Sequence, residues 1–262
     1  MSTPLRPAAA CLTRASITSS LKVELRRLTR SGLGLGVLVG FAFFGLSGPV
    51  LSIYMPEILG AAASTDQLAI SASQATPADA ISLFNQSAMQ LGLIVTVAVA
   101  ITSIGWDTRP GSSIFYRTRV HRLSTVLLPR LIIDWLIALA TYSCGLLLAV
   151  VVTASAIGHP PAGMVIRTWI ACGLYIVMAM SIGHLIAASL RRTTTAIALT
   201  TLLVLVLPVM NQVPGTSRWV PTALLLPTGL HAIPVIAALV VTGLCAVGSV
   251  LIARRQTLRR DA

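Results

Sequence analysis

Residues 107–130 read DTRPGSSIFYRTRVHRLSTVLLPR, and this polar stretch separates two long apolar segments. Basic loops of multi-spanning membrane proteins stay on the cytoplasmic side, so the stretch predicts a cytoplasmic loop. Aromatic side chains among arginines are also typical of a surface that docks a partner protein. A loop that only fixes topology would carry the same arginines, and both interpretations remain open. The residues concerned are Arg109, Phe115, Tyr116, Arg117, Arg119, Arg122 and Arg130.

The composition around this loop is that of an integral membrane protein. Of the 262 residues, 55% are hydrophobic and 10% are charged, and the mean hydropathy is +0.87. A soluble domain carries about 25% charged residues. The net charge of +12 does not indicate nucleic-acid binding, because the cations lie beside apolar segments rather than on a soluble face.

Six segments are apolar and long enough to cross a bilayer, which takes about 20 residues. We therefore predict an all-α integral membrane protein whose transmembrane domain covers residues 17–255. A disordered cytoplasmic tail is expected at 1–16 and a short cytoplasmic tail at 256–262. The outer side is expected to hold a polar loop at 55–82, a short turn at 157–163, and a segment at 211–231 whose apolar core, residues 223–226, is too short to span. The predicted spans are about 33–54, 83–106, 127–156, 164–190, 194–211 and 232–253.

The distribution of cations orients these spans. Of the 19 Lys and Arg residues, only Arg167 and Arg218 fall on the predicted outer side, which leaves 17 inside. This bias predicts that both termini are cytoplasmic. Arg167 lies near the outer end of the fourth span, where its side chain can snorkel to the lipid headgroups.

Residues 17–30 are predicted to form an amphipathic helix in the headgroup layer before the first span. Its apolar residues recur at helical spacing, and its cations flank that stripe, as in helices that lie on anionic lipid. The stripe consists of Ile17, Leu21, Leu25 and Leu28.

Small and polar residues inside the spans predict helix contacts. Gly32, Gly36 and Gly40 form two consecutive GxxxG steps, which allow another helix of this chain or of a second protomer to approach closely. Arg130 and Asp134 are four residues apart, so they can form an ion pair on one helical face.

A second polar group lies near the outer end of the second span. Asn85, Gln86 and Gln90 either hydrogen-bond within the bundle or line a polar path.

No cofactor site is expected in this chain. Lys22 is the only lysine, and it follows Ser-Ser-Leu rather than a glycine-rich turn, so the chain cannot supply the P-loop of an ATPase. The cysteines form no CxxC pair, and three of them lie inside apolar segments, which argues against a metal site or a disulfide framework. They are Cys11, Cys144, Cys172 and Cys245.

The order of these elements resembles the ABC-2 type permease family, the membrane subunits of ABC exporters, over about residues 17–255. The family places an acid, a glycine, an apolar and basic run, and then a cation in the loop before the third span. Asp107, Gly111, residues 114–117 and Arg130 match that order, although Tyr116 stands where the family often has proline. Residues 226–229, reading LPTG, are similar to the family's outer segment.

The resemblance implies a non-enzymatic permease subunit in the plasma membrane of a prokaryote. It implies a second permease protomer and a separate ATPase subunit that carries ATP and magnesium. The ATPase would dock on Asp107, Gly111, Phe115, Tyr116, Arg117, Arg119, Arg122 and Arg130. The substrate would be an unidentified small molecule, lipid or peptide.

Two other functions are compatible with parts of the sequence. A membrane scaffold or assembly protein would show the same spans and basic loops. Residues 45–48 read GLSG, which resembles the GxSG motif of rhomboid intramembrane proteases, with His184 as a candidate base for Ser47. The predicted spans place Ser47 and His184 toward opposite membrane faces, whereas a nucleophile and its base must lie about 3 Å apart.

Overall fold

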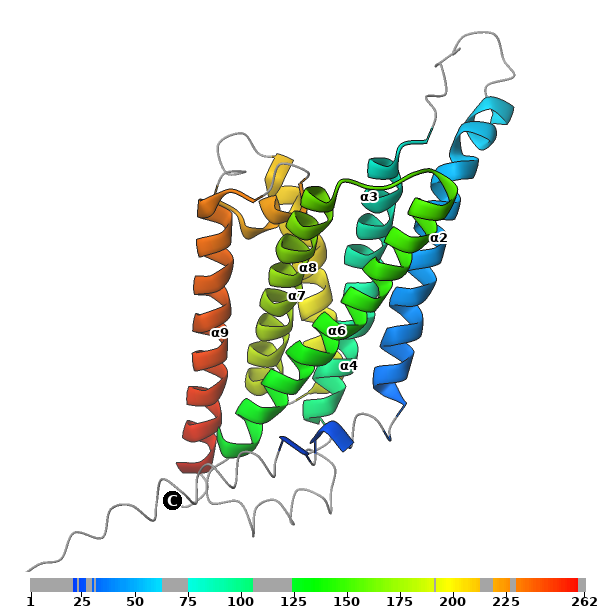
Figure 1. The fold of residues 1–262 in the computed structure, drawn as a ribbon. Coiled ribbons are helices and arrows are strands. Elements are labelled where there is room, and N and C mark those ends of the chain that lie inside the picture. Colours follow the sequence, from blue (N-terminus) through cyan, green and yellow to red (C-terminus); the bar gives the residue numbers. More distant parts are fainter. Residues whose placement is uncertain are drawn as a thin grey trace, which may run out of the picture.

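The computed structural model is all-helical in the part of the chain that it describes, without strands there (Figure 1). Six helices are long and apolar enough to cross a membrane. The prediction of a multi-pass helical membrane protein is confirmed at that level. The described residues are 21–22, 24–26, 30, 32–62, 75–105, 124–190, 192–212, 219–226 and 230–258.

The six spans follow the predicted order along the chain. The second span is continuous although it contains three helical segments, because the π-helical η1 joins two α-helices. The fifth span continues into a 3-10 helix. In chain order the elements are α2 (Leu33–Ala62), α3 (Pro77–Ser87), η1 (Ala88–Gly92), α4 (Leu93–Gly105), α6 (Ser124–Ala156), α7 (Ala162–Leu190), α8 (Thr193–Val206), η3 (Leu207–Gln212), η4 (Pro221–Leu225) and α9 (Ala232–Leu258).

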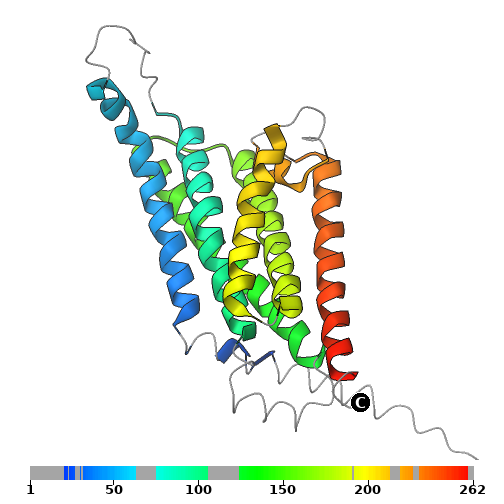
Figure 2. The same cartoon turned by 180° about the vertical axis from the view of Figure 1, so that it is seen from behind.

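Helix α7 lies at the centre of the bundle and contacts α4, α6, α8 and α9 (Figures 1 and 2). Small residues on α7 let its neighbours come close; Gly173, for example, faces the Leu139 side chain of α6. Helix α6 runs obliquely across the bundle, from α2 at one end toward α9 at the other (Figure 1). Its 33 residues measure about 50 Å, so a tilted path suits a hydrocarbon core of about 30 Å.

Helix α2 packs closely against α6 and α3 through glycines that the sequence analysis did not assign to packing. A Cβ atom on Gly45 would overlap the carbonyl oxygen of Gly145. A Cβ atom on Gly48 would lie 2.8 Å from the backbone of Phe84. These contacts give the GLSG segment a structural role, because only glycine permits such backbone proximity.

The predicted packing face of Gly32, Gly36 and Gly40 does not pack within the described part of this chain. A Cβ atom on any of the three would meet no atom within 4 Å, and Gly32 has a φ of +70° just before α2 begins. The described part of the chain therefore provides no neighbour for this face, and the choice between a helix of this chain and a second protomer stays a prediction.

The second span begins at Pro77, earlier than the predicted start near residue 83. Thr76 caps this helix: its hydroxyl accepts a hydrogen bond from the Asp79 N–H, and the Asp79 carboxylate accepts from the Thr76 N–H. Proline follows the cap at the first helical position, where its missing N–H costs nothing. The residues 76–79, TPAD, are a helix-start signal, so the polar loop before them is shorter than predicted.

The segment between α8 and α9 covers the end of the bundle that is predicted to face outward, called here the outer end. Helix η4 contacts α7 and α9 and buries Thr222, Ala223 and Leu224. The Thr222 hydroxyl hydrogen-bonds the Asn211 side-chain oxygen at 2.9 Å, which ties η4 to η3. Two short 3-10 helices, η3 and η4, are thus the helical part of this segment among its described residues.

Orientation in the membrane stays a prediction, and so does the N-terminal helix at 17–30, of which 21–22, 24–26 and 30 are described and have helical backbone. An impermeant thiol reagent added to intact cells should label a cysteine placed at Thr65 and not one placed at Ser112, in a chain whose native cysteines are replaced by alanine. The reverse labelling pattern would show that the bundle is inserted the other way round.

Candidate functional site

The bundle contains a cavity of about 1210 Å³ near its outer end. Side chains from α3, η1, α7, α8, η3 and η4 line it. Ligand pockets in proteins usually measure about 300–1,000 Å³, so this space is large enough for a sizeable organic molecule. A packed membrane bundle leaves few voids larger than water, which makes the cavity the leading candidate for a functional site.

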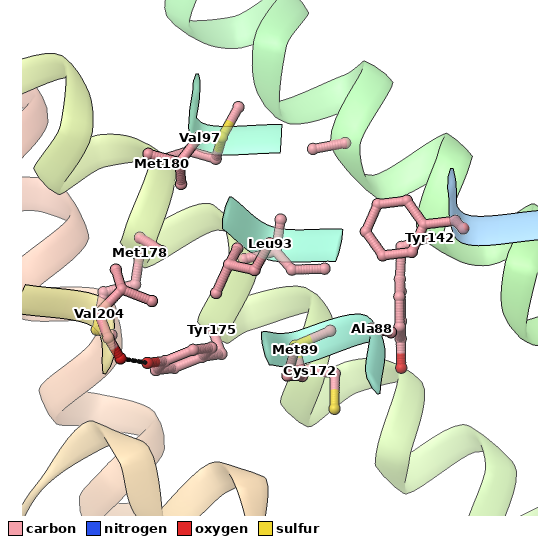
Figure 3. Packing of buried hydrophobic residues seen from close by; sticks show 14 of the residues in the cluster. Ala88, Met89, Leu93, Val97, Tyr142, Cys172, Tyr175, Met178, Met180 and Val204 are labelled. Atoms are coloured by element: carbon pink, nitrogen blue, oxygen red, sulfur yellow. Dashed lines mark hydrogen bonds between the residues drawn. The ribbon is translucent and has the colours of Figure 1, made fainter. Parts of the chain in front are cut away.

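The inner wall of the cavity is apolar and held in place by Tyr175 of α7. The hydroxyl of Tyr175 donates a hydrogen bond to the Val204 carbonyl of α8 at 3.4 Å (Figure 3). In a regular helix that carbonyl would accept from residue 208, but Pro208 has no N–H. Pro208 therefore leaves the Val204 carbonyl free to accept the hydrogen bond from Tyr175. Met89 and Cys172 complete this apolar wall (Figure 3).

The second span supplies the polar wall. The Asn85 side chain accepts a hydrogen bond from the Tyr142 hydroxyl at 2.8 Å and donates one to the Ile81 carbonyl at 2.9 Å. Tyr142 is fixed in turn by ring contacts with Phe41 and Phe84. Asn85 thus follows the first of its two predicted roles and also borders the cavity.

Gln86 and Gln90 lie along the same wall, and their prediction as the lining of a polar path stays a prediction. Both side chains are exposed and line the cavity. Gln90 lies within the π-helical turn η1, and such turns occur often at functional sites because they redirect side chains. Gly92 ends this turn, where a Cβ atom would lie 2.9 Å from the Phe41 ring.

Two basic side chains border the cavity toward the outer end. Arg167 is exposed on the second turn of α7, and His231 is exposed immediately before α9. The sequence analysis placed Arg167 near this end but gave it lipid headgroups as neighbours; in the structure it lines the cavity. It did not single out His231, and only the position of this residue beside the last span hinted at a role.

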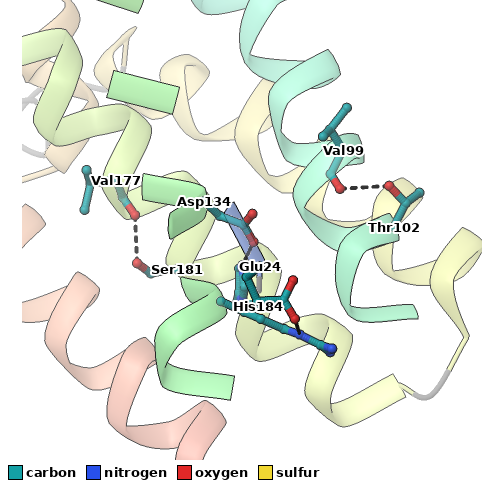
Figure 4. Close-up of polar contacts among 8 residues, drawn as sticks. Glu24, Val99, Thr102, Asp134, Val177, Ser181 and His184 are labelled. Atoms are coloured by element: carbon teal, nitrogen blue, oxygen red, sulfur yellow. Dashed lines mark hydrogen bonds and ion pairs between the residues drawn. The ribbon is translucent and has the colours of Figure 1, made fainter. Parts of the chain in front are cut away.

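A separate group of buried charges lies at the inner end of the bundle (Figure 4). Arg130 donates a hydrogen bond from Nε to Glu24 Oε1 at 2.7 Å, and His184 Nε2 lies 2.9 Å from Asp134 Oδ2. The first contact connects the segment before α2 to α6, and the second connects α6 to α7. Removing one partner of a buried ion pair typically costs about 3–5 kcal/mol because the other charge is left uncompensated, so the inner end is sensitive to the loss of Arg130 or Glu24.

These pairs add to what was predicted. Arg130 and Asp134 were expected to pair with each other, and that contact stays a prediction. Glu24 was not singled out, because the neighbouring cations of its own segment would serve equally well as partners. His184 Nδ1 is buried without a hydrogen-bond partner in the described part of the chain.

Most of the predicted docking loop lies outside the described residues. This applies to Asp107, Gly111, Phe115, Tyr116, Arg117, Arg119 and Arg122. Arg130 is the described member of that set, and it is buried rather than available at a surface.

No family model matches the chain, and no curated protein matches it. The function therefore has to be argued from the cavity and the buried charges.

The residues of the protease hypothesis have separate neighbours in the structure. The Ser47 hydroxyl donates to the Phe44 carbonyl of its own helix at 3.5 Å, whereas His184 contacts Asp134. Among the described residues, no group of three His, Cys, Asp or Glu side chains is arranged to hold a metal ion.

Proposed function

We propose that this chain is the permease subunit of an ABC exporter and that the outer cavity is part of its substrate pathway. The observation that carries the proposal is a cavity of about 1210 Å³, walled partly by polar side chains, inside a six-helix membrane bundle. The resemblance of the sequence to ABC-2 type permeases supplies the class of transporter.

The polar wall favours a transport pathway over a scaffold. Polar side chains at membrane depth are costly unless they face protein, water or a ligand. Gln86 and Gln90 face the cavity, and Arg167 borders it. A scaffold would gain stability by filling this space with apolar side chains, whereas a transporter needs it for its substrate.

The energy for transport comes, in this proposal, from a separate chain. Since this chain has no P-loop lysine, ATP and magnesium belong on an ATPase subunit. Two permease protomers in a prokaryotic plasma membrane would form a two-fold dimer, with an ATPase below each. The unpacked glycines of α2 are available for that protomer contact.

The inner charges offer a route for coupling. Glu24 belongs to the segment before the first span, and Arg130 follows the central loop at the start of α6. A partner that moves either segment would therefore act on the same ion pair. Asp134, one turn further along α6, extends this connection to His184 on α7.

Docking of an ATPase tests the proposal through the central loop. The Arg117→Glu/Arg119→Glu variant should bind the ATPase at least about tenfold more weakly, because like charges across an interface cost several kcal/mol. Phe115→Ala should also weaken binding, through lost apolar burial. The measurement is the amount of ATPase that copurifies with each tagged permease from its native host.

The ionic strength of the buffer distinguishes the charged contact of the arginines from the apolar contact of Phe115. At high ionic strength the defect of the arginine variant should shrink, while the defect of Phe115→Ala should persist. The matched control is Arg192→Gln, which removes an exposed cation from the short turn before α8. Equal ATPase binding by all variants would mean that the loop is only a topology signal.

A further inference from the structure

Among its described lining residues, the cavity has basic side chains and no acidic ones. Arg167 is a permanent cation, His231 becomes a cation when protonated, and the cavity lining in the described part of the chain includes no Asp or Glu. Arginine is the preferred partner of carboxylate, sulfate and phosphate groups because its planar guanidinium donates two parallel hydrogen bonds. The outer part of the cavity therefore favours an anionic group.

The inner part of the cavity has the opposite character. Met89, Ala171, Val204 and Leu224 present apolar surface there, and all four are buried. Tyr175 lies eight residues after Arg167 on α7, a separation of about 12 Å along the helix axis. The polar and apolar parts are thus far enough apart to contact different ends of one molecule.

We propose that this cavity binds an amphiphile with a single acidic headgroup. The headgroup pairs with Arg167 and accepts a further hydrogen bond from His231, while the chain lies against the apolar wall between α7 and α8. Gln86 and Gln90 donate amide hydrogen bonds to polar atoms near the head. That this molecule is the exported substrate rests on the proposed function. That the cavity binds it does not, because binding needs no ATPase.

The charge of Arg167 favours an acidic amphiphile over a cationic or an uncharged one. A cationic amphiphile would meet Arg167 as a like charge with no acid among the described lining residues to offset it. An uncharged amphiphile would form no charge-assisted hydrogen bond with the guanidinium of Arg167, and such bonds are about twice as strong as neutral ones.

The test is equilibrium binding to the purified chain in nanodiscs of phosphatidylcholine, which carry no net charge. The probes are radiolabelled decanoate and decyl sulfate, with decanol and decyltrimethylammonium as chain-matched controls; empty nanodiscs measure partition into lipid. Decanoate and decyl sulfate should bind saturably, and decanol and decyltrimethylammonium at least about tenfold more weakly, the value of one charge-assisted hydrogen bond. Phosphatidylglycerol added to the disc should displace decanoate if the ligand enters from the bilayer, and leave it bound if a single-chain acid enters from water.

Substitutions locate the headgroup. Arg167→Gln should weaken decanoate binding at least about tenfold and leave decanol unchanged, Arg167→Lys should retain part of the affinity, and Arg192→Gln should have no effect. Equal binding of decanoate and decanol by the wild type, or equal loss of both in Arg167→Gln, would overturn the proposal. Because no ATPase is present, this result is independent of whether the loop docks one.

Discussion

Replacing Gly145 by valine is expected to prevent the bundle from assembling correctly. A Cβ atom at this position would lie 2.7 Å from the Phe41 carbonyl oxygen of α2 and 3.0 Å from the Phe41 carbonyl carbon. Backbone atoms cannot rotate away as a side chain can, so α2 and α6 would have to separate. Overpacking of a core typically costs about 1–3 kcal/mol, and a backbone clash belongs at or above the upper end of that range.

The measurement is the fraction of monodisperse protein after detergent extraction, together with its thermal midpoint. Gly36→Val is the matched control on α2, because a Cβ atom there meets nothing within 4 Å. It should leave the thermal midpoint of the single chain unchanged. If Gly145→Val extracts and melts like the wild type, the close approach of α2 and α6 is wrong.

A larger substitution at Gly36 distinguishes an effect on assembly from an effect on folding. If a second protomer packs on Gly32, Gly36 and Gly40, Gly36→Leu should lower the dimer fraction without unfolding the chain. An unchanged dimer fraction would mean that this face contacts lipid. The GxxxG spacing alone could not distinguish these cases, because it indicates close packing without naming the partner.

The spans could be predicted from sequence because hydropathy and length decide them. The predicted third span, 127–156, coincides with the apolar part of α6. The break predicted at Arg191 and Arg192 falls between the end of α7 at Leu190 and the start of α8 at Thr193. The second span was placed too late because its first turns are polar. Thr76, Pro77 and Asp79 start that helix through capping, which a hydropathy window does not register.

The candidate site was predictable only in part. Polar residues at membrane depth pointed to Asn85, Gln86 and Gln90, and the structure places all three along the cavity. Residues far apart in the sequence, such as Arg167 and His231, come to line one cavity only through helix packing, which periodicity does not specify. The Glu24–Arg130 contact likewise joins residues from different segments, whereas sequence reasoning considered partners within one helix.

Access to Gln86 is expected to change strongly with nucleotide. This side chain is exposed in the outer cavity, so a cysteine placed there reports whether the pathway is open to the outside. ATP-driven closure of the ATPases would favour the outward-open bundle. A ligand that binds one of two states more tightly shifts their populations by its difference in binding free energy. A tenfold change in labelling rate therefore needs a difference of only about 1.4 kcal/mol.

The central claim is therefore tested most directly by labelling Gln86→Cys in the reconstituted permease–ATPase complex, with the native cysteines replaced by alanine. An impermeant thiol reagent on the outer side should react at least about tenfold faster with a non-hydrolysable ATP analogue than without nucleotide. A cysteine at Thr65, in the predicted outer loop, should react at one rate in both conditions. Equal rates at Gln86→Cys, with the ATPase bound, would contradict the account, because the cavity would then take no part in an ATP-driven transport cycle.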